Sequence, residues 1–392
     1  MRRRYPVGRR QSGIRLAATR TVAADRIGAR RTGGLAEALR SAWLRIEPAA
    51  SVDRSEFCAP SVGATQSERW RARGTIGAVK RAWICVVVVA GCGHRSSERA
   101  GEEDRRPAPA KPSFPLVVAR TALRTAIYGD ADRSPPPDPP AGVLVKTHYR
   151  RGGDALVAYA SPVVEGTRRP AIVWIAGGFS WGIDDNSWTP GPPDNDQSAT
   201  TLRQPGIVLM RPALRGASGN PGRPECFLGE VDDIIAAGDY LAARPDVDPS
   251  RIYLGGHSTG GTLALLTAAS TDRFRAIFAF GPIADPREYG PDGCLPADVA
   301  DAEVLPRAPM IWMDAVVTPT FVIEGAGGNV AAFPDLARDA SQAVSFLTVP
   351  GADHFDVLQP GSRHVVRAIL EDRGPRPAIR LDAAAIAAEV AR

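Results

Sequence analysis

From residue 142 onward, short apolar runs alternate with stretches of helix length, and this alternation constrains the fold more than any other feature of the chain. Parallel strands must be joined by a long crossover, usually a helix, so the alternation predicts βαβ units and a mainly parallel sheet with helices on both faces. The first two runs are joined by a short "GGD" turn and should form an antiparallel hairpin. We predict strands over 143–150, 155–160, 171–176, 206–211, 251–256, 275–281, 319–324 and 344–349, and helices over 229–243, 259–270, 334–343 and 362–371.

The charge of the chain is divided unevenly along its length. Residues 1–92 hold 18 Lys and Arg against 6 Asp and Glu, whereas the remainder has more acidic than basic residues. A basic segment can bind nucleic acid, but this one has neither a zinc-ligand pattern nor a helix-turn-helix pattern. We therefore expect no nucleic-acid partner.

The segment 79–92, "VKRAWICVVVVAGC", has the layout of an export signal, in which basic residues precede a short apolar run and small residues. Its last four residues resemble the lipobox of bacterial lipoproteins, which implies lipidation of Cys92 and attachment to the membrane of the cell envelope. The alternative is an ordinary buried strand. A signal belongs at the start of a chain, so residues 1–78 are expected to be a disordered or mis-assigned leader. A Pro-rich tether over 93–141 and a catalytic domain over 142–392 should follow.

Two cysteines, Cys226 and Cys294, lie within the expected catalytic domain. In an oxidising compartment they could form a disulfide, although sequence alone cannot show that they lie close enough. Neither has His or Cys neighbours at metal-ligand spacing, and we expect neither a metal nor an organic cofactor.

The stretch "YLGGHSTGGTLALL", residues 253–266, places Ser258 between pairs of glycines where a predicted strand meets a predicted helix. This G-x-S-x-G pattern in a strand–turn–helix context is the nucleophile elbow of serine hydrolases. The alternative is a serine that only caps the helix. We predict that Ser258 is the nucleophile.

A serine nucleophile needs a general base, and position selects one of the five histidines. His354 lies in the loop "PGADHF" after the last predicted strand, where this arrangement of strands requires the base. The oxyanion hole should combine the backbone N–H of Gly178 or Phe179, after the third strand, with that of Thr259. The long loop 177–199, which carries Trp181, Trp188 and several Asp, is expected to contact substrate, unless it is only solvated surface.

The chain resembles the α/β-hydrolase fold, and in particular the catalytic domain of prolyl oligopeptidases and dienelactone hydrolases. The resemblance rests on 206–261, in which an Arg-Gly loop leads to an Asp-bearing helix, then to "DPSRI" and the elbow. It extends over about 142–372 and implies a serine hydrolase that forms an acyl-enzyme on a small ester, amide or peptide substrate.

The sequence departs from the family where the third member of a catalytic triad is expected. After the seventh strand it has "EGAGGN", residues 324–329, with no Asp following the first glycine. We favour Asp285, which follows the sixth strand, as the acid, with Glu324 as the alternative and Asn329 as a weaker orienting group. The competing interpretation is a catalytically inactive hydrolase fold that serves as a binding or scaffold protein of the cell envelope.

Overall fold

A computed structural model of the chain describes residues 114–390, which belong to a compact unit spanning Lys111–Arg392. The expected leader, the signal segment with Cys92 and the front of the expected tether lie outside the described residues. Within the part that the structure describes, no helix has the length and apolar character needed to span a membrane.

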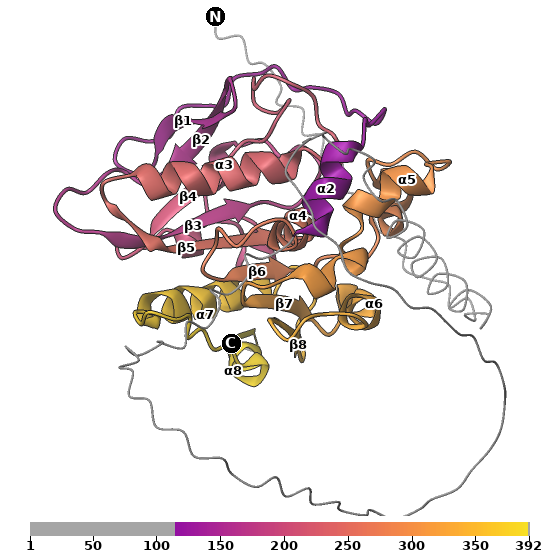
Figure 1. Cartoon of the computed structure of the whole chain (residues 1–392). Helices are drawn as coiled ribbons and strands as arrows, with labels where there is room; N and C mark the ends of the chain where they lie inside the picture. Colours follow the sequence, from indigo (N-terminus) through magenta and orange to yellow (C-terminus); the bar gives the residue numbers. More distant parts are fainter. Residues whose placement is uncertain (1–113, 391–392) are drawn as a thin grey trace, which may run out of the picture. The chain divides into compact units, whose positions relative to one another are not determined.

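The described residues form an eight-stranded sheet in the order β1-β2-β4-β3-β5-β6-β7-β8 (Figure 1). The first two strands form the predicted hairpin, β2 is also antiparallel to β4, and all later pairs are parallel. This is the α/β-hydrolase fold, and all eight predicted strands are confirmed. They are β1 (Val145–Arg151), β2 (Asp154–Ala160), β3 (Arg169–Ile175), β4 (Val208–Pro212), β5 (Val247–His257), β6 (Ile277–Phe280), β7 (Thr320–Gly325) and β8 (Val344–Val349).

The helices are α2 (Pro115–Ala122), α3 (Glu230–Ala243), α4 (Thr259–Ala268), α5 (Asp301–Val304), α6 (Phe333–Ala337), α7 (Leu358–Glu371) and α8 (Ala383–Val390). Of the predicted helices, the one over 334–343 is shorter than expected. Its chain leaves the helical path early, and the Ser341 N–H donates to the Met313 carbonyl before β8 begins. The sequence analysis missed α2, α5 and α8.

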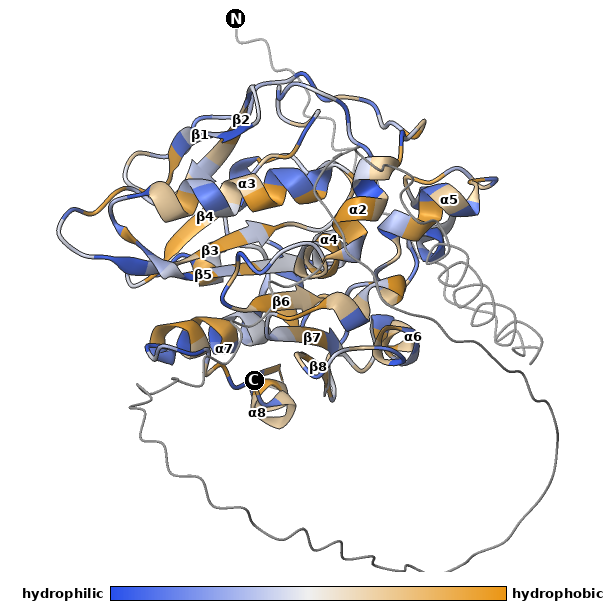
Figure 2. Ribbon diagram, viewed as in Figure 1, coloured by the Kyte–Doolittle hydropathy of each residue, from blue (hydrophilic) through white to orange (hydrophobic). Residues whose placement is uncertain are grey.

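Apolar side chains cover both faces of the sheet. On one face, Ile172, Tyr253 and Phe278 pack with residues of α7 and α8 in a single buried cluster. Because side chains alternate along a strand, the equally buried neighbours Val173 and Leu254 point to the opposite face, where α3 and α4 lie. Much of β3, β4, β6 and β7 has the orange colour of hydrophobic residues, whereas β1 is pale to blue (Figure 2). The central strands therefore read as continuous apolar runs, as expected for a sheet covered on both faces.

Helix α4, which begins directly after Ser258, is buried along its whole length. A Cβ added at Gly260 would lie 2.3 Å from the Ile175 carbonyl oxygen, and one at Gly261 would lie 2.5 Å from the Phe280 carbonyl oxygen. Only glycine permits this approach, so the two glycines after the elbow set the start of α4 against β3 and β6.

The part of the expected tether that the structure describes packs on the domain. In α2, Leu116 is fully buried; further along, the Gly129 N–H donates to the Pro224 carbonyl at 2.8 Å. The Pro137 carbonyl accepts a hydrogen bond from the Tyr159 hydroxyl at 2.5 Å. The ordered domain therefore begins ahead of residue 142, where the sequence analysis placed its start.

Candidate active site

Ser258 lies between the end of β5 and the start of α4, with φ 55° and ψ −116°. A positive φ is sterically unfavourable for a residue with a side chain, and such strain is typical of functional turns. The backbone N–H of Ser258 donates to the Phe280 carbonyl at 2.8 Å, which holds the turn against β6. The Ser258 side chain makes no capping hydrogen bond to α4, so the helix-capping interpretation finds no support.

His354 follows β8 and is held by Glu324, the penultimate residue of β7. The distance between His354 Nδ1 and Glu324 Oε2 is 2.8 Å. Glu324 is fully buried, and its carboxylate also accepts the N–H groups of Gly325 at 2.7 Å and Asn329 at 2.9 Å. The side chain of Asn329 donates to the Gly281 carbonyl at 3.0 Å. Asn329 thus fixes the carboxylate through its backbone, while its amide group binds a neighbouring strand end.

Glycines leave room for this pair. A Cβ at Gly281, which has φ 54°, would lie 2.4 Å from His354 Cε1 and 2.6 Å from Glu324 Oε2. A Cβ at Gly328 would lie 2.5 Å from Glu324 Cδ. These glycines, one of them in the stretch that lacks the expected Asp, therefore leave the space into which the Glu324 side chain folds back.

The preference for Asp285 over Glu324 has to be corrected. Asp285 caps the 3₁₀ helix η4 (Pro286–Asp292), accepting the Arg287 N–H at 2.9 Å and pairing with the Arg287 guanidinium at 2.5 Å. Both interactions direct the carboxylate to its own helix. The structure brings Glu324, and not Asp285, to His354.

His257, which the sequence analysis left without a role, contacts the backbone of His354. Its Nε2 lies 3.1 Å from the His354 carbonyl oxygen, and the two ring centroids are 4.5 Å apart. Burial, together with the nearby His354, lowers the pKa of His257 to about 3. The ring is therefore neutral near pH 7, and its Nε2–H donates to the carbonyl. The residue before the nucleophile thus positions the loop that carries the candidate base.

The three predicted oxyanion residues lie together at the start of α4. Thr259 is the first residue of the helix, so the helix supplies no partner for its backbone N–H. Its hydroxyl donates to the Gly178 carbonyl at 2.5 Å, which joins the loop after β3 to the elbow. Gly178 has φ 84°, and a Cβ at Gly177 would lie only 3.2 Å from Ser258 Cβ. The Gly178–Phe179 backbone is therefore held beside the nucleophile.

Four aromatic side chains, two of them from this loop, pack against one another. Phe179 and Tyr289 meet edge to face at 5.1 Å, while Phe227 stacks on Tyr289 at 5.8 Å and meets Trp181 at 5.3 Å. The Tyr289 hydroxyl lies 3.0 Å from Thr262 Oγ1. Burial raises the pKa of Tyr289 well above its ordinary value, although the hydroxyls of Thr262 and Ser258 act in the opposite direction. A neutral phenol therefore lies near the nucleophile; no motif in the sequence marked it.

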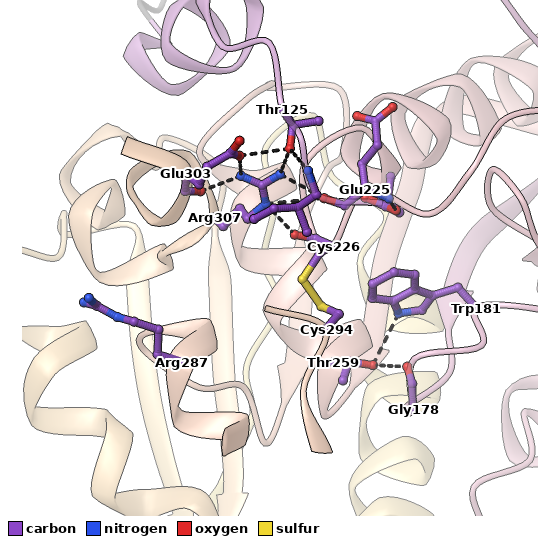
Figure 3. The surroundings of a disulfide bond; sticks show 12 residues. Thr125, Gly178, Trp181, Glu225, Cys226, Thr259, Arg287, Cys294, Glu303 and Arg307 are labelled. Carbon is purple, nitrogen blue, oxygen red and sulfur yellow. Dashed lines mark hydrogen bonds and ion pairs between the residues drawn. A yellow bond between two sulfur atoms is a disulfide. The ribbon is translucent and has the colours of Figure 1, made fainter. Parts of the chain in front are cut away.

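The disulfide that the sequence left open is present and adjoins this aromatic cluster (Figure 3). Cys226 precedes Phe227 in the chain, and Cys294 follows the helix that carries Tyr289; the two Cα atoms are 5.6 Å apart. The fully buried Arg307 donates to the Cys226 carbonyl at 2.8 Å. The bridge thus joins two segments that supply aromatic walls of the site.

The long loop after β3 is partly packed and partly exposed. Trp181 is buried, and Trp188 meets Tyr159 edge to face at 5.2 Å. Asp184, Asp185 and Asp194 are exposed. Among residues 114–390, no group of three or more His, Cys, Asp or Glu side chains could hold a metal ion.

Part of the chain is similar to known proteins. Residues 221–304 match the sequence model of the prolyl oligopeptidase family. Over 96 residues the chain is 35% identical to a polyketide transferase of Penicillium crustosum. The aligned segment is 24% of this chain and 31% of that protein. Over 162 residues it is 30% identical to an uncharacterised protein of Mycobacterium tuberculosis. This aligned segment is 40% of this chain and 57% of that protein.

A solved puromycin-hydrolysing peptidase of Mycobacterium tuberculosis aligns with a TM-score of 0.47 and 20% identity, over 61% of this chain and 42% of that one. The chain spans less than two thirds of the length of the curated relatives given above. The segment that matches the family model includes the elbow at Ser258, so this part of the α/β-hydrolase fold is similar to the prolyl oligopeptidase family, as the sequence resemblance implied.

Proposed function

We propose that the protein is a serine hydrolase that cleaves a small ester, amide or peptide substrate through an acyl-enzyme on Ser258. The observation that carries the proposal is the strained Ser258 turn combined with the buried Glu324 carboxylate, 2.8 Å from the His354 ring. A strained nucleophile at the end of one strand and an oriented histidine at the end of another are the two parts that this chemistry requires.

In this mechanism His354 Nε2 takes the hydroxyl proton as Ser258 Oγ attacks the substrate carbonyl. The Glu324 carboxylate accepts the Nδ1–H bond and stabilises the imidazolium that forms. The backbone N–H groups of Thr259 and of Gly178 or Phe179 bind the negative oxygen of the tetrahedral intermediate. The imidazolium then protonates the leaving group. Water attacks the acyl-enzyme while His354 takes a proton from it, and the imidazolium passes that proton to Ser258 Oγ as the acid product leaves.

Among residues 114–390, the His354 ring forms its hydrogen bond with Glu324, and none joins it to Ser258. In substrate-free hydrolases this contact is often long and shortens when substrate binds. The contact of His257 with the His354 backbone keeps the loop that carries the ring next to the elbow.

The competing function, an inactive hydrolase fold that binds a partner, drew its support from the missing carboxylate. Glu324 supplies that carboxylate from β7, and the alternative is weakened accordingly. The test is labelling of the purified protein by a fluorophosphonate probe, followed by mass spectrometry of the peptide that contains Ser258. We expect one adduct on Ser258 in the wild-type protein and none in Ser258→Ala. A folded wild-type protein without an adduct would support the inactive alternative.

We further propose that the enzyme is exported and held at a bacterial membrane by a lipid on Cys92. The support is the order of basic, apolar and small residues in 79–92. Cys92→Ser should release the protein from membranes and leave hydrolysis of a soluble ester unchanged, because lipid on this residue would be the anchor. Wild-type protein found only in the soluble cytosolic fraction would contradict the proposal.

A further inference from the structure

The loop after β3 encloses a polar cavity of about 340 Å³ beside the candidate active site. We call it the loop cavity. Its lining includes Ala176 and Gly177 from the oxyanion loop, hydroxyl and amide side chains such as Ser180 and Asn195, and Arg211 from β4. A small polar group fits such a space better than a long aliphatic chain, because few apolar side chains line it.

Arg211 differs from the other buried arginines of the described chain. Arg120, Arg215, Arg244 and Arg307 each form an ion pair with an Asp or Glu at 2.9 Å or less. Arg211 is only 3% exposed, yet its side chain donates to the neutral hydroxyl of Ser187, 3.0 Å from Nη1. No ion pair among residues 114–390 includes Arg211, although the charge of Asp184 attracts it.

A buried cation without an ion-pair partner is unfavourable, because burial removes water that the protein has not replaced. Burial also lowers the pKa of Arg211, and the attraction of Asp184 offsets this only in part. None of the other guanidinium nitrogens of Arg211 is both fully buried and without a hydrogen-bond partner, and the residue lines the loop cavity. The free side of the guanidinium therefore faces the cavity.

The loop cavity adjoins the nucleophile. Gly177 lines it, and a Cβ on Gly177 would lie 3.2 Å from Ser258 Cβ. Gly177 is thus next to both the nucleophile and the cavity, and a molecule with its carbonyl group at Ser258 would have to pass this residue to place another group in the cavity. A guanidinium binds a carboxylate with two parallel hydrogen bonds, which gives both affinity and orientation.

We propose that the loop cavity binds a carboxylate of the substrate through Arg211, so that the preferred substrates are small carboxylate-bearing esters or amides. This inference rests on the proposed hydrolase function. Asp184 lines the same cavity from an exposed position, and its carboxylate already accepts the N–H and side-chain amide of Asn186. It opposes an incoming anion, and its removal should strengthen carboxylate binding.

The first experiment measures ligand binding to the Ser258→Ala protein, which cannot turn over. Monomethyl glutarate, an anion, is compared with dimethyl glutarate, its neutral counterpart, by isothermal titration at pH 7 and low salt. We expect the anion to bind at least about tenfold more tightly, and Arg211→Gln to abolish this preference without changing the affinity for the diester. Equal affinities, or a preference that survives Arg211→Gln, would overturn the proposal.

Two further variants test whether the effect of Arg211→Gln is electrostatic or results from a change in folding. Arg211→Lys keeps the charge but not the planar fork, so it should retain part of the preference even if Arg211→Gln folds poorly. Asp184→Asn should increase anion affinity, because it removes a negative charge from the cavity. A preference that is absent in Arg211→Lys and unaffected by Asp184→Asn would show that the effect is structural and not electrostatic.

The second experiment separates this inference from the proposed function. Values of kcat/KM for p-nitrophenyl hemiglutarate and p-nitrophenyl methyl glutarate are compared in the wild-type protein, alongside fluorophosphonate labelling of Ser258. Labelling without any preference for the hemiglutarate would overturn the carboxylate site alone. Carboxylate binding without labelling would overturn the hydrolase function and leave an anion-binding cavity in an inactive fold.

Discussion

Exchange of Glu324 for Gln should remove most of the activity, because it takes the charge from a buried and fully hydrogen-bonded carboxylate. Glu324 accepts three hydrogen bonds, from His354 at 2.8 Å, Gly325 at 2.7 Å and Asn329 at 2.9 Å. Gln has the same shape but offers one oxygen and one NH₂ group. In either orientation the NH₂ group meets a donor, so one buried N–H loses its acceptor or the His354 ring changes tautomer.

Two magnitudes follow. Replacing a triad acid by its amide lowers turnover by about 10⁴, which corresponds to about 5 kcal/mol of transition-state stabilisation. An unsatisfied buried donor costs about 1–3 kcal/mol of folding stability, so the variant should remain folded at 25 °C in a domain of ordinary stability. The matched control is Asp285→Asn, in which Asn can still cap η4 and only a partly exposed ion pair with Arg287 is lost, worth less than about 1 kcal/mol.

The assay is initial-rate hydrolysis of a p-nitrophenyl ester by both variants and the wild-type protein, with urea unfolding to confirm that each is folded. Turnover should collapse in Glu324→Gln and stay near the wild-type level in Asp285→Asn. The reasoning is refuted if Glu324→Gln loses less than about tenfold, far below the 10⁴ expected of a triad acid. It is also refuted if Asp285→Asn is the variant that fails.

Three further predictions concern the surroundings of the site. Replacing both Cys226 and Cys294 by Ser opens a loop of 68 residues and should lower the unfolding free energy by about 4 kcal/mol in urea titrations; an unchanged free energy would contradict this. The pKa of His257, about 3 when folded, lies below the unfolded value, so the unfolded state binds the proton first and stability falls as pH drops from about 6.5 toward about 3. Between pH 7 and pH 5, wild-type protein should lose about 2 kcal/mol more than His257→Gln, and equal losses would contradict this assignment. Gly281→Ala should abolish ester hydrolysis by displacing the imidazole of the candidate base, whereas Gly152→Ala, also at positive φ but with no atom nearby, should lower stability and leave hydrolysis intact.

The sequence alone determined the features that depend on local pattern. Alternating apolar runs predicted the parallel sheet because a strand and a crossover helix have different lengths and periods. The elbow at Ser258 was recognisable because glycines are required at fixed offsets when a helix starts this close to a strand. His354 could be selected because chain order in this fold leaves the base only one place, after the last strand.

Tertiary structure decided which distant side chains meet. Spacing could not separate Asp285 from Glu324, because the choice depends on which carboxylate is already held by local donors and which one has room to fold back over glycine. The same limit applies to the bridge between Cys226 and Cys294 and to the absence of an ion-paired carboxylate at Arg211 among residues 114–390. Each depends on the distance between elements far apart in the chain, which packing of the sheet and its loops sets and local sequence does not encode.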